Sequence, residues 1–144
     1  MVTDADLEDW AVGSRKNFAA VAELVGAPAD EAERDPVSVV PLLQVYVNRL
    51  PLTEFQADDW VTLHADLVSF VARVMAARLG AAWEVRPAPN APRGYRYVLS
   101  ATDAQGAVHV VDPFQVVAME FRQPRIEIAR MLATAELNLG VPDR

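Results

Sequence analysis

The sequence predicts an α+β fold. In it, N-terminal helices and one long amphipathic helix pack on a three-stranded antiparallel meander, which is closed by C-terminal helices. Three observations predict this fold. Apolar residues recur every three or four positions over residues 60–74, which is typical of an amphipathic helix. Gly80 ends that helix directly before a strand, and two further strand patterns follow at 95–101 and 107–112. Helices on both sides of a sequential meander favour the α+β class.

The predicted elements belong to a single domain of residues 1–144. We divide it into an acidic N-terminal helical segment and linker (1–35) and a part with helices and the meander core (36–144). With 52% apolar and 23% charged residues, the chain has a globular composition. A chain of 144 residues buries roughly two-thirds of the surface that its unfolded form exposes.

The N-terminal segment predicts one helix and a loop. Thr3 followed by Asp6 is a capping-box pattern, because each residue can satisfy a free amide of the other in the first turn. An apolar stripe then runs to Gly26, with Gly13 as a candidate interruption. Residues 27–36 are polar and acidic, so we expect a solvated loop there.

Two more helices are predicted before the sheet. The first covers residues 39–50 with Ser38 as its N-cap, although its β-branched residues leave a strand as the alternative. The second is the long helix, for which Thr53 and Gln56 form a second capping-box pattern. Its expected end is Gly80, a residue type that readily adopts the left-handed conformation of a helix C-terminus.

The second half predicts strands and two closing helices. A short strand at 82–85 leads into a proline-rich loop at 86–94, which cannot pair as a central strand. After the other two strands, Asp112 is expected to cap a short helix whose first residue is Pro113. A last helix is expected at about 125–139.

Composition and charge exclude several classes of function. The absence of cysteine excludes disulfides, thiolate metal sites and cysteine nucleophiles. Residues 1–66 hold thirteen acidic and four basic side chains, a balance of −9, whereas 67–144 have a balance of +2. An acidic surface repels nucleic acid and anionic lipid and attracts basic partners. Since Asp66, Arg73 and Arg78 break the longest apolar stretch, we expect no membrane span and a cytoplasmic location.

The ionisable residues do not predict a reactive centre. His64 is expected at the edge of the core, and Asp66 lies about 200° around the same helix, so the two cannot share a ligand. His109 and Asp112 point to opposite faces of a strand, because side chains alternate with period two. We therefore predict no catalytic residues, no metal site and no cofactor, and the sequence favours a protein that is not an enzyme.

One segment is a candidate binding surface. Arg86, Arg93, Tyr95, Arg96 and Tyr97 lie on or beside the proline-stiffened loop. Arginine and tyrosine are enriched at binding hot spots, and a stiff loop loses little entropy when it docks. The alternative is a hairpin connection with solvated arginines and with tyrosines that pack on the sheet.

These observations predict a non-enzymatic protein-binding module, such as an adaptor or an immunity- or chaperone-like partner. The expected partner is another protein, and the acidic N-terminal half favours a basic one. The alternative is a small-ligand-binding protein or minor enzyme with a pocket between the long helix and the sheet, lined by Trp60, His64, Tyr97 and His109. A homodimer formed through the first helices is a further expectation.

The second half also resembles a group of small bacterial domains with no assigned activity. In that group a helix ends in Leu-Gly-x-x-Trp, and three strands lead to a Val-x-Pro-Phe-like closure. The resemblance covers roughly 53–122 and implies a fold rather than an activity. The matching residues are Leu79, Gly80, Trp83, Val111, Pro113 and Phe114.

Overall fold

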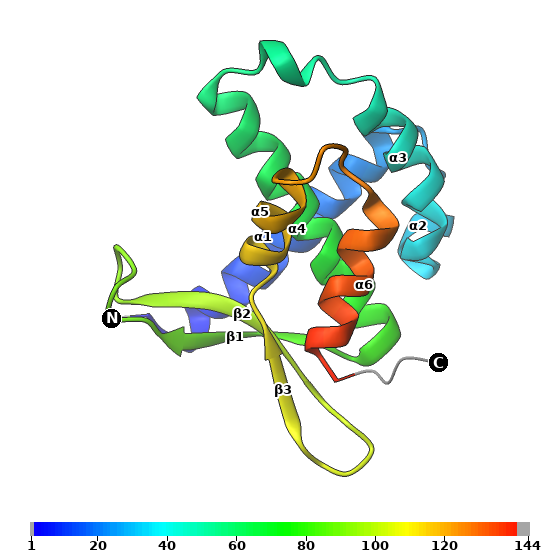
Figure 1. The fold of residues 1–144 in the computed structure, drawn as a ribbon. Helices are drawn as coiled ribbons and strands as arrows, with labels where there is room; N and C mark the ends of the chain where they lie inside the picture. The colour runs from blue at the N-terminus through cyan, green and yellow to red at the C-terminus, as the bar shows by residue number, and fades with distance from the viewer. Residues whose placement is uncertain (1, 141–144) are drawn as a thin grey trace.

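The computed structural model of the chain describes residues 2–140 and has the α+β fold that the sequence predicts. Figure 1 shows a helical body with the sheet at one end of it. The elements in chain order are α1 (Asp4–Leu24), α2 (Ala29–Arg34), the 3-10 helix η1 (Pro36–Val39), α3 (Val40–Asn48), the 3-10 helix η2 (Leu52–Glu54), α4 (Ala57–Leu79), β1 (Ala82–Pro87), β2 (Tyr95–Thr102), β3 (Val108–Val111), α5 (Pro113–Phe121) and α6 (Ile128–Asn138).

Helix α4 is the centre of the hydrophobic core. It contacts α1, α5 and α6 as well as the start of β1 (Figure 1). Its apolar stripe is buried as the spacing predicts, and Leu67, Phe70, Val71 and Val74 are inaccessible to solvent. One cluster of buried residues extends from α1 to the end of α6, so every layer of the molecule shares this core.

Helix α4 also bears on the membrane expectation. Among the described residues it is the one helix whose length and mean hydropathy of 1.3 would allow it to cross a membrane, although we expected no such segment from the sequence. Half of its most apolar window is buried inside the fold, which is what a core helix of this length requires.

Helix α1 begins as predicted and has no interruption at Gly13. The Thr3 hydroxyl accepts the Asp6 amide at 3.1 Å, and the Asp6 carboxylate accepts the Thr3 amide at 2.9 Å. Hydrogen bonding to Thr3 also lowers the pKa of Asp6. The helix continues without a break through Gly13, because Phe18 and Val21 further along it pack into the core.

The prediction of a loop at residues 27–36 is wrong. Its first part is the short helix α2, which buries Ala32 against the core, and η1 follows directly. Ser38 lies inside η1, where its hydroxyl donates to the Asp35 carbonyl at 2.7 Å, so it does not cap α3. The long helix is likewise capped by Gln56 and Asp59 rather than by the predicted Thr53–Gln56 pair, since Thr53 belongs to η2.

The sheet has the order β1-β2-β3 with antiparallel pairs, in which Trp83 faces Leu99 and Leu99 faces Val111. Alternation along the strands divides the side chains between two faces. We call the face that packs on the helices the inner face; it contains Trp83, Tyr95, Tyr97, Leu99, His109 and Val111. The opposite, outer face contains Glu84, Arg86, Arg96, Val98, Val108 and Val110.

The closing helices are fixed by two carboxylates. The Asp112 side chain caps α5 as predicted, and it accepts the Phe114 amide at 2.9 Å. Glu120, only 4% exposed, accepts the Glu127 amide at 3.0 Å and Arg130 Nε at 3.1 Å. These bonds tie α5 to α6, and the sequence analysis did not foresee them.

Candidate functional site

The structure separates the five predicted binding residues. Arg86 and Arg96 are opposite one another on the outer face, whereas Tyr95 and Tyr97 are on the inner face. Arg93 lies in the loop between β1 and β2. Arg86 and Arg96 are therefore on the side of the hairpin opposite to the tyrosines, whereas Arg93 lines one open hollow together with Tyr95 and Tyr97.

The tyrosines belong to an aromatic cluster with α1. The Trp10 ring stacks on Tyr97 with centroids 4.4 Å apart, and Trp83 meets Trp10 edge-on at 5.5 Å. Tyr95 lies edge-on to Tyr97 at 5.6 Å. Burial, with a further contribution from Tyr95, raises the pKa of Tyr97, so its phenol remains protonated at neutral pH. This cluster joins α1 to the sheet and leaves Tyr95 half-buried at the rim of an open hollow.

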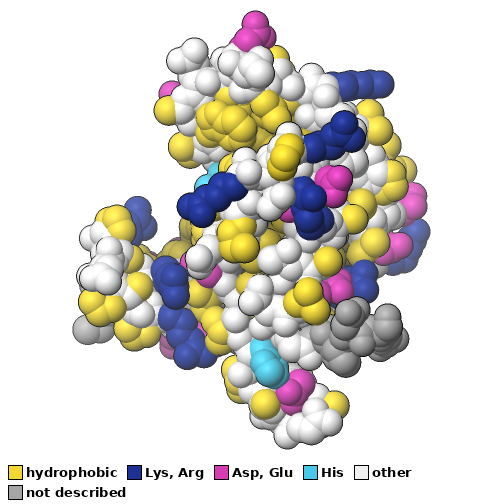
Figure 2. All heavy atoms as spheres, viewed as in Figure 1, with side chains coloured by type: hydrophobic (Ala, Val, Ile, Leu, Met, Phe, Trp, Pro, Cys, Tyr) yellow, Lys and Arg dark blue, Asp and Glu magenta, His cyan; other side chains and the backbone are white. Residues whose placement is uncertain are grey.

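The outer face combines charged and apolar side chains. Arg86 Nε lies 3.1 Å from the Glu84 carboxylate, and Arg96 Nη1 donates to the Asp112 carboxylate at 3.2 Å. On β3, Val108 is 60% exposed, and Val110 is also exposed. Figure 2 shows dark blue side chains over the sheet and over the helical body on the same side of the molecule.

The four residues of the alternative pocket are in three places. Trp60 and His64 line a shallow hollow together with Phe121 of α5. His64 Nε2 is 2.8 Å from the Phe114 carbonyl oxygen, so this imidazole joins α4 to α5. Tyr97 instead stacks on Trp10, away from that hollow.

His109, the fourth of them, pairs with a carboxylate that the sequence analysis did not consider. Its Nε2 lies 2.7 Å from Asp103 Oδ2, and its ring packs directly against Gly140. Asp103 also accepts the Gln105 and Ala107 amides, both at 2.9 Å, which fixes the turn between β2 and β3. Hydrogen bonding from His109, with help from these amides, lowers the pKa of Asp103. The sequence signal that could have predicted this pair is an aspartate in the β2–β3 turn, six residues before the histidine.

Over residues 2–140, no three histidine, aspartate or glutamate side chains are grouped so that they could hold a metal ion. The two imidazoles also have different partners, a backbone carbonyl for His64 and a carboxylate for His109. The two imidazoles therefore do not act on a common group.

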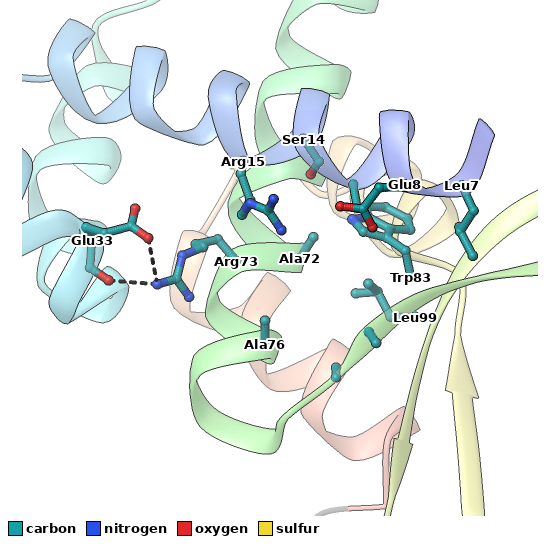
Figure 3. Close-up of a pocket in the computed structure, with 13 residues that line it drawn as sticks. Leu7, Glu8, Ser14, Arg15, Glu33, Ala72, Arg73, Ala76, Trp83 and Leu99 are labelled. Atoms are coloured by element: carbon teal, nitrogen blue, oxygen red, sulfur yellow. Dashed lines mark hydrogen bonds and ion pairs between the residues drawn. The ribbon is translucent and has the colours of Figure 1, made fainter. Parts of the chain in front are cut away.

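The sequence analysis also missed a groove between α1, α4 and β1. It has a volume of about 410 Å³, and Figure 3 shows its lining. Arg15 of α1 and Arg73 of α4 lie toward one side, and Glu8 and Trp83 lie toward the other. We had considered Arg73 only as an interruption of an apolar stretch, because its partner Glu33 is forty residues away in the chain.

Comparisons with protein-family models, with curated proteins and with solved structures give no match to this chain.

Proposed function

We propose that the chain is a non-enzymatic protein-binding module of the bacterial cytoplasm, comparable to an adaptor or to an immunity- or chaperone-like protein, and that it binds through the outer face of its sheet. One observation carries this proposal. The outer face exposes Val108 and Val110 near the β2–β3 turn, and it carries Arg86 and Arg96 toward the β1–β2 loop.

The composition of this face supports recognition of a protein. Exposed apolar side chains gain free energy when a partner removes them from water. The guanidiniums of Arg86 and Arg96, toward the other end of the face, supply planar donors that suit carboxylates. The face is therefore complementary to an apolar protein surface bordered by acidic residues. The basic partner that the charge of residues 1–66 predicts would need a different surface.

The charges on this face are already partly neutralised, which affects what they contribute. Arg86 and Arg96 each have an acidic neighbour, Glu84 and Asp112. A partner's carboxylates would compete with exposed ion pairs that stabilise the fold little. Such charges direct the encounter and the orientation of the partner, whereas the valines supply the buried area.

The test compares matched substitutions on two faces. The immobilised chain is first used to capture its partner protein from the source cell. The purified partner is then titrated by calorimetry against the wild type and against the Val108→Asp and Val61→Asp variants. Val61 is a suitable control because it is 66% exposed on α4, against 60% for Val108. We expect Val108→Asp to weaken binding by at least about tenfold, because a buried charge is costly, and Val61→Asp to change it less than about twofold.

Arg96→Glu and Arg49→Glu form a second matched pair, since both arginines are exposed and Arg49 is distant from the sheet at the end of α3. Only Arg96→Glu should slow association, and the difference should shrink at high salt. Equal effects of both members of either pair, or loss of binding with Val61→Asp alone, would overturn the proposal. Light scattering of the pure protein shows whether a second copy covers the face instead.

A further inference from the structure

The groove between α1, α4 and β1 is built like a small-molecule site. Its volume of about 410 Å³ is in the range of ligand pockets. Five alanines keep it open, because their side chains are too short to fill it. They come from α1, from α4 and from the junction between α4 and β1, namely Ala11, Ala72, Ala76, Ala81 and Ala82.

Arg73 is held in place in this groove but is not fully paired. Its Nη2 donates to the Glu33 carbonyl oxygen at 2.7 Å and lies 3.3 Å from the Glu33 carboxylate. The guanidinium carbon is 6.0 Å from the centre of the Phe18 ring. Its Nε is buried and has no acceptor among residues 2–140. A guanidinium has five N–H donors, so Arg73 is preorganised while some of its donors remain unused.

Arg15 adds a second guanidinium to the same groove. It extends from α1 toward the side where Arg73 lies (Figure 3). Within the described part of the chain, Arg15 has no carboxylate at ion-pair distance. The side with the two guanidiniums is therefore positively charged despite Glu33, and its potential favours an anion.

The other side of the groove has different chemistry. Trp83 presents its indole there, and Glu8 also lies toward this side of the groove (Figure 3). The alanines and the indole form an apolar wall, and Glu8 repels a second anionic group. The groove therefore has one cationic side for a charged group and one apolar side for a hydrocarbon or aromatic body.

From this arrangement we infer that the groove binds a small organic anion. Its carboxylate or phosphate group contacts Arg15 and Arg73, and its apolar body lies on the alanines against Trp83. The site is separate from the outer face, so the inference does not depend on the proposed protein partner. This inference keeps a small-ligand site between the long helix and the sheet, as the alternative hypothesis expected. The residues that line it differ from the predicted Trp60, His64, Tyr97 and His109.

The test is a titration followed by ¹⁵N NMR. Phenyl phosphate and benzoate serve as probes, and phenol is the neutral control of the same shape. We expect either anion to shift the Arg73 Nε–H and Trp83 indole N–H resonances with saturation, and phenol to leave the Arg73 signal unchanged. The anion that binds more tightly shows whether the site prefers a phosphate or a carboxylate group.

Two variants leave the Arg73–Glu33 contact intact. Arg15→Gln removes one donor group, and we expect at least about tenfold weaker binding. Ala76→Leu fills the groove from an exposed helical position and should abolish the shifts. Arg34→Gln removes an exposed charge on α2 outside the groove and should change the affinity less than about twofold.

Several results would overturn the inference. One is the absence of saturable shifts with both anions, and another is equal weakening by Arg15→Gln and Arg34→Gln. Equal affinity for inorganic phosphate and phenyl phosphate would show that only charge is recognised and that the apolar side has no role. Retained binding in Ala76→Leu would place the probe elsewhere.

Discussion

The inner and outer faces of the sheet differ in what covers them. On the inner face, Leu99 and Val111 are part of the core cluster, and Trp83 packs against Trp10 of α1. On the outer face, Val98 is as buried as Leu99, with 1% exposure each, yet it lies outside that cluster. The burial of Val98 therefore does not come from the hydrophobic core cluster that buries Leu99.

This difference indicates a division of roles between the faces. A face covered by helices is held by packing that cannot rearrange without cost. A face outside that core cluster can accept a partner at little cost in stability. Substitutions on the inner face should therefore affect folding, and those on the outer face should mainly affect binding.

The largest effect is expected from Leu99→Ala compared with Val98→Ala. Leu99→Ala should lower the free energy of unfolding by about 2–5 kcal/mol, because the surrounding helices cannot close the cavity. Val98→Ala should cost about 1–1.5 kcal/mol, close to the transfer free energy alone, because flexible neighbours can fill the space. Urea titrations measure both. Equal costs would show that the outer face is as rigid as the inner one.

The next largest effect is expected from Trp83→Ala, which should lower the free energy of unfolding by about 3 kcal/mol. This value is at the lower end for a tryptophan because the ring is only half-buried. The ring contacts Trp10 edge-on, and Phe114 lies 6.5 Å from it. Trp83→Phe is the control, since it keeps an aromatic contact and should recover part of the loss. A cost below about 1 kcal/mol in urea would contradict the role of Trp83 as an anchor between α1 and the sheet.

Gly140→Ala tests the far end of the inner face, where α6 ends beside β3. Gly140 has a φ of +81°, and an added Cβ would lie 2.8 Å from the His109 ring. Gly106 is a matched control, because its φ is +83° and an added Cβ meets no atom within 4 Å. Both variants carry the conformational cost of about 1 kcal/mol, and Gly140→Ala should cost about 1–2 kcal/mol more. Equal melting temperatures would refute the close packing of His109 on Gly140.

Local sequence signals predicted most of the elements around the two faces. The three- and four-residue spacing in α4, the Gly80 end and the Asp112 cap each depend on residues close together in the chain. Helix α2 was missed because four of its six residues are charged, which resembles a loop. It forms because Ala32 is buried against the core, which is a tertiary effect.

The candidate sites were harder to predict. The alternation of strand side chains could have separated Arg96 from Tyr95 and Tyr97, but we treated the loop and strand as one patch. The groove could not have been predicted, because Arg15, Arg73 and Trp83 come from three elements whose arrangement depends on the whole fold. Charge and spacing identify which residues face water, but not which of them converge.

A smaller effect, dependent on pH, is expected at the β2–β3 turn. Because His109 lowers the pKa of Asp103, the ionised carboxylate stabilises the folded state. This contribution is complete above the ordinary carboxyl pKa of about 3.9 and is lost as the pH falls through the lower folded value. Asp103→Asn should therefore lower the urea midpoint at pH 7, with a much smaller difference below pH 3. Glu54→Gln, at an exposed position, controls for the change in net charge. A difference that persists unchanged in acid would exclude this origin.

The smallest effect on stability is expected from the Arg96–Asp112 pair on the outer face. Arg96 is largely exposed, so solvent and salt screen the interaction, and a double-mutant cycle should give a coupling below about 0.5 kcal/mol. Asp112→Ala alone should cost about 1 kcal/mol, because it also removes the α5 cap. Arg96→Ala should leave the urea midpoint nearly unchanged while it weakens partner binding. A coupling above 1 kcal/mol would mean that this ion pair serves the fold, and the two faces would then not differ in role.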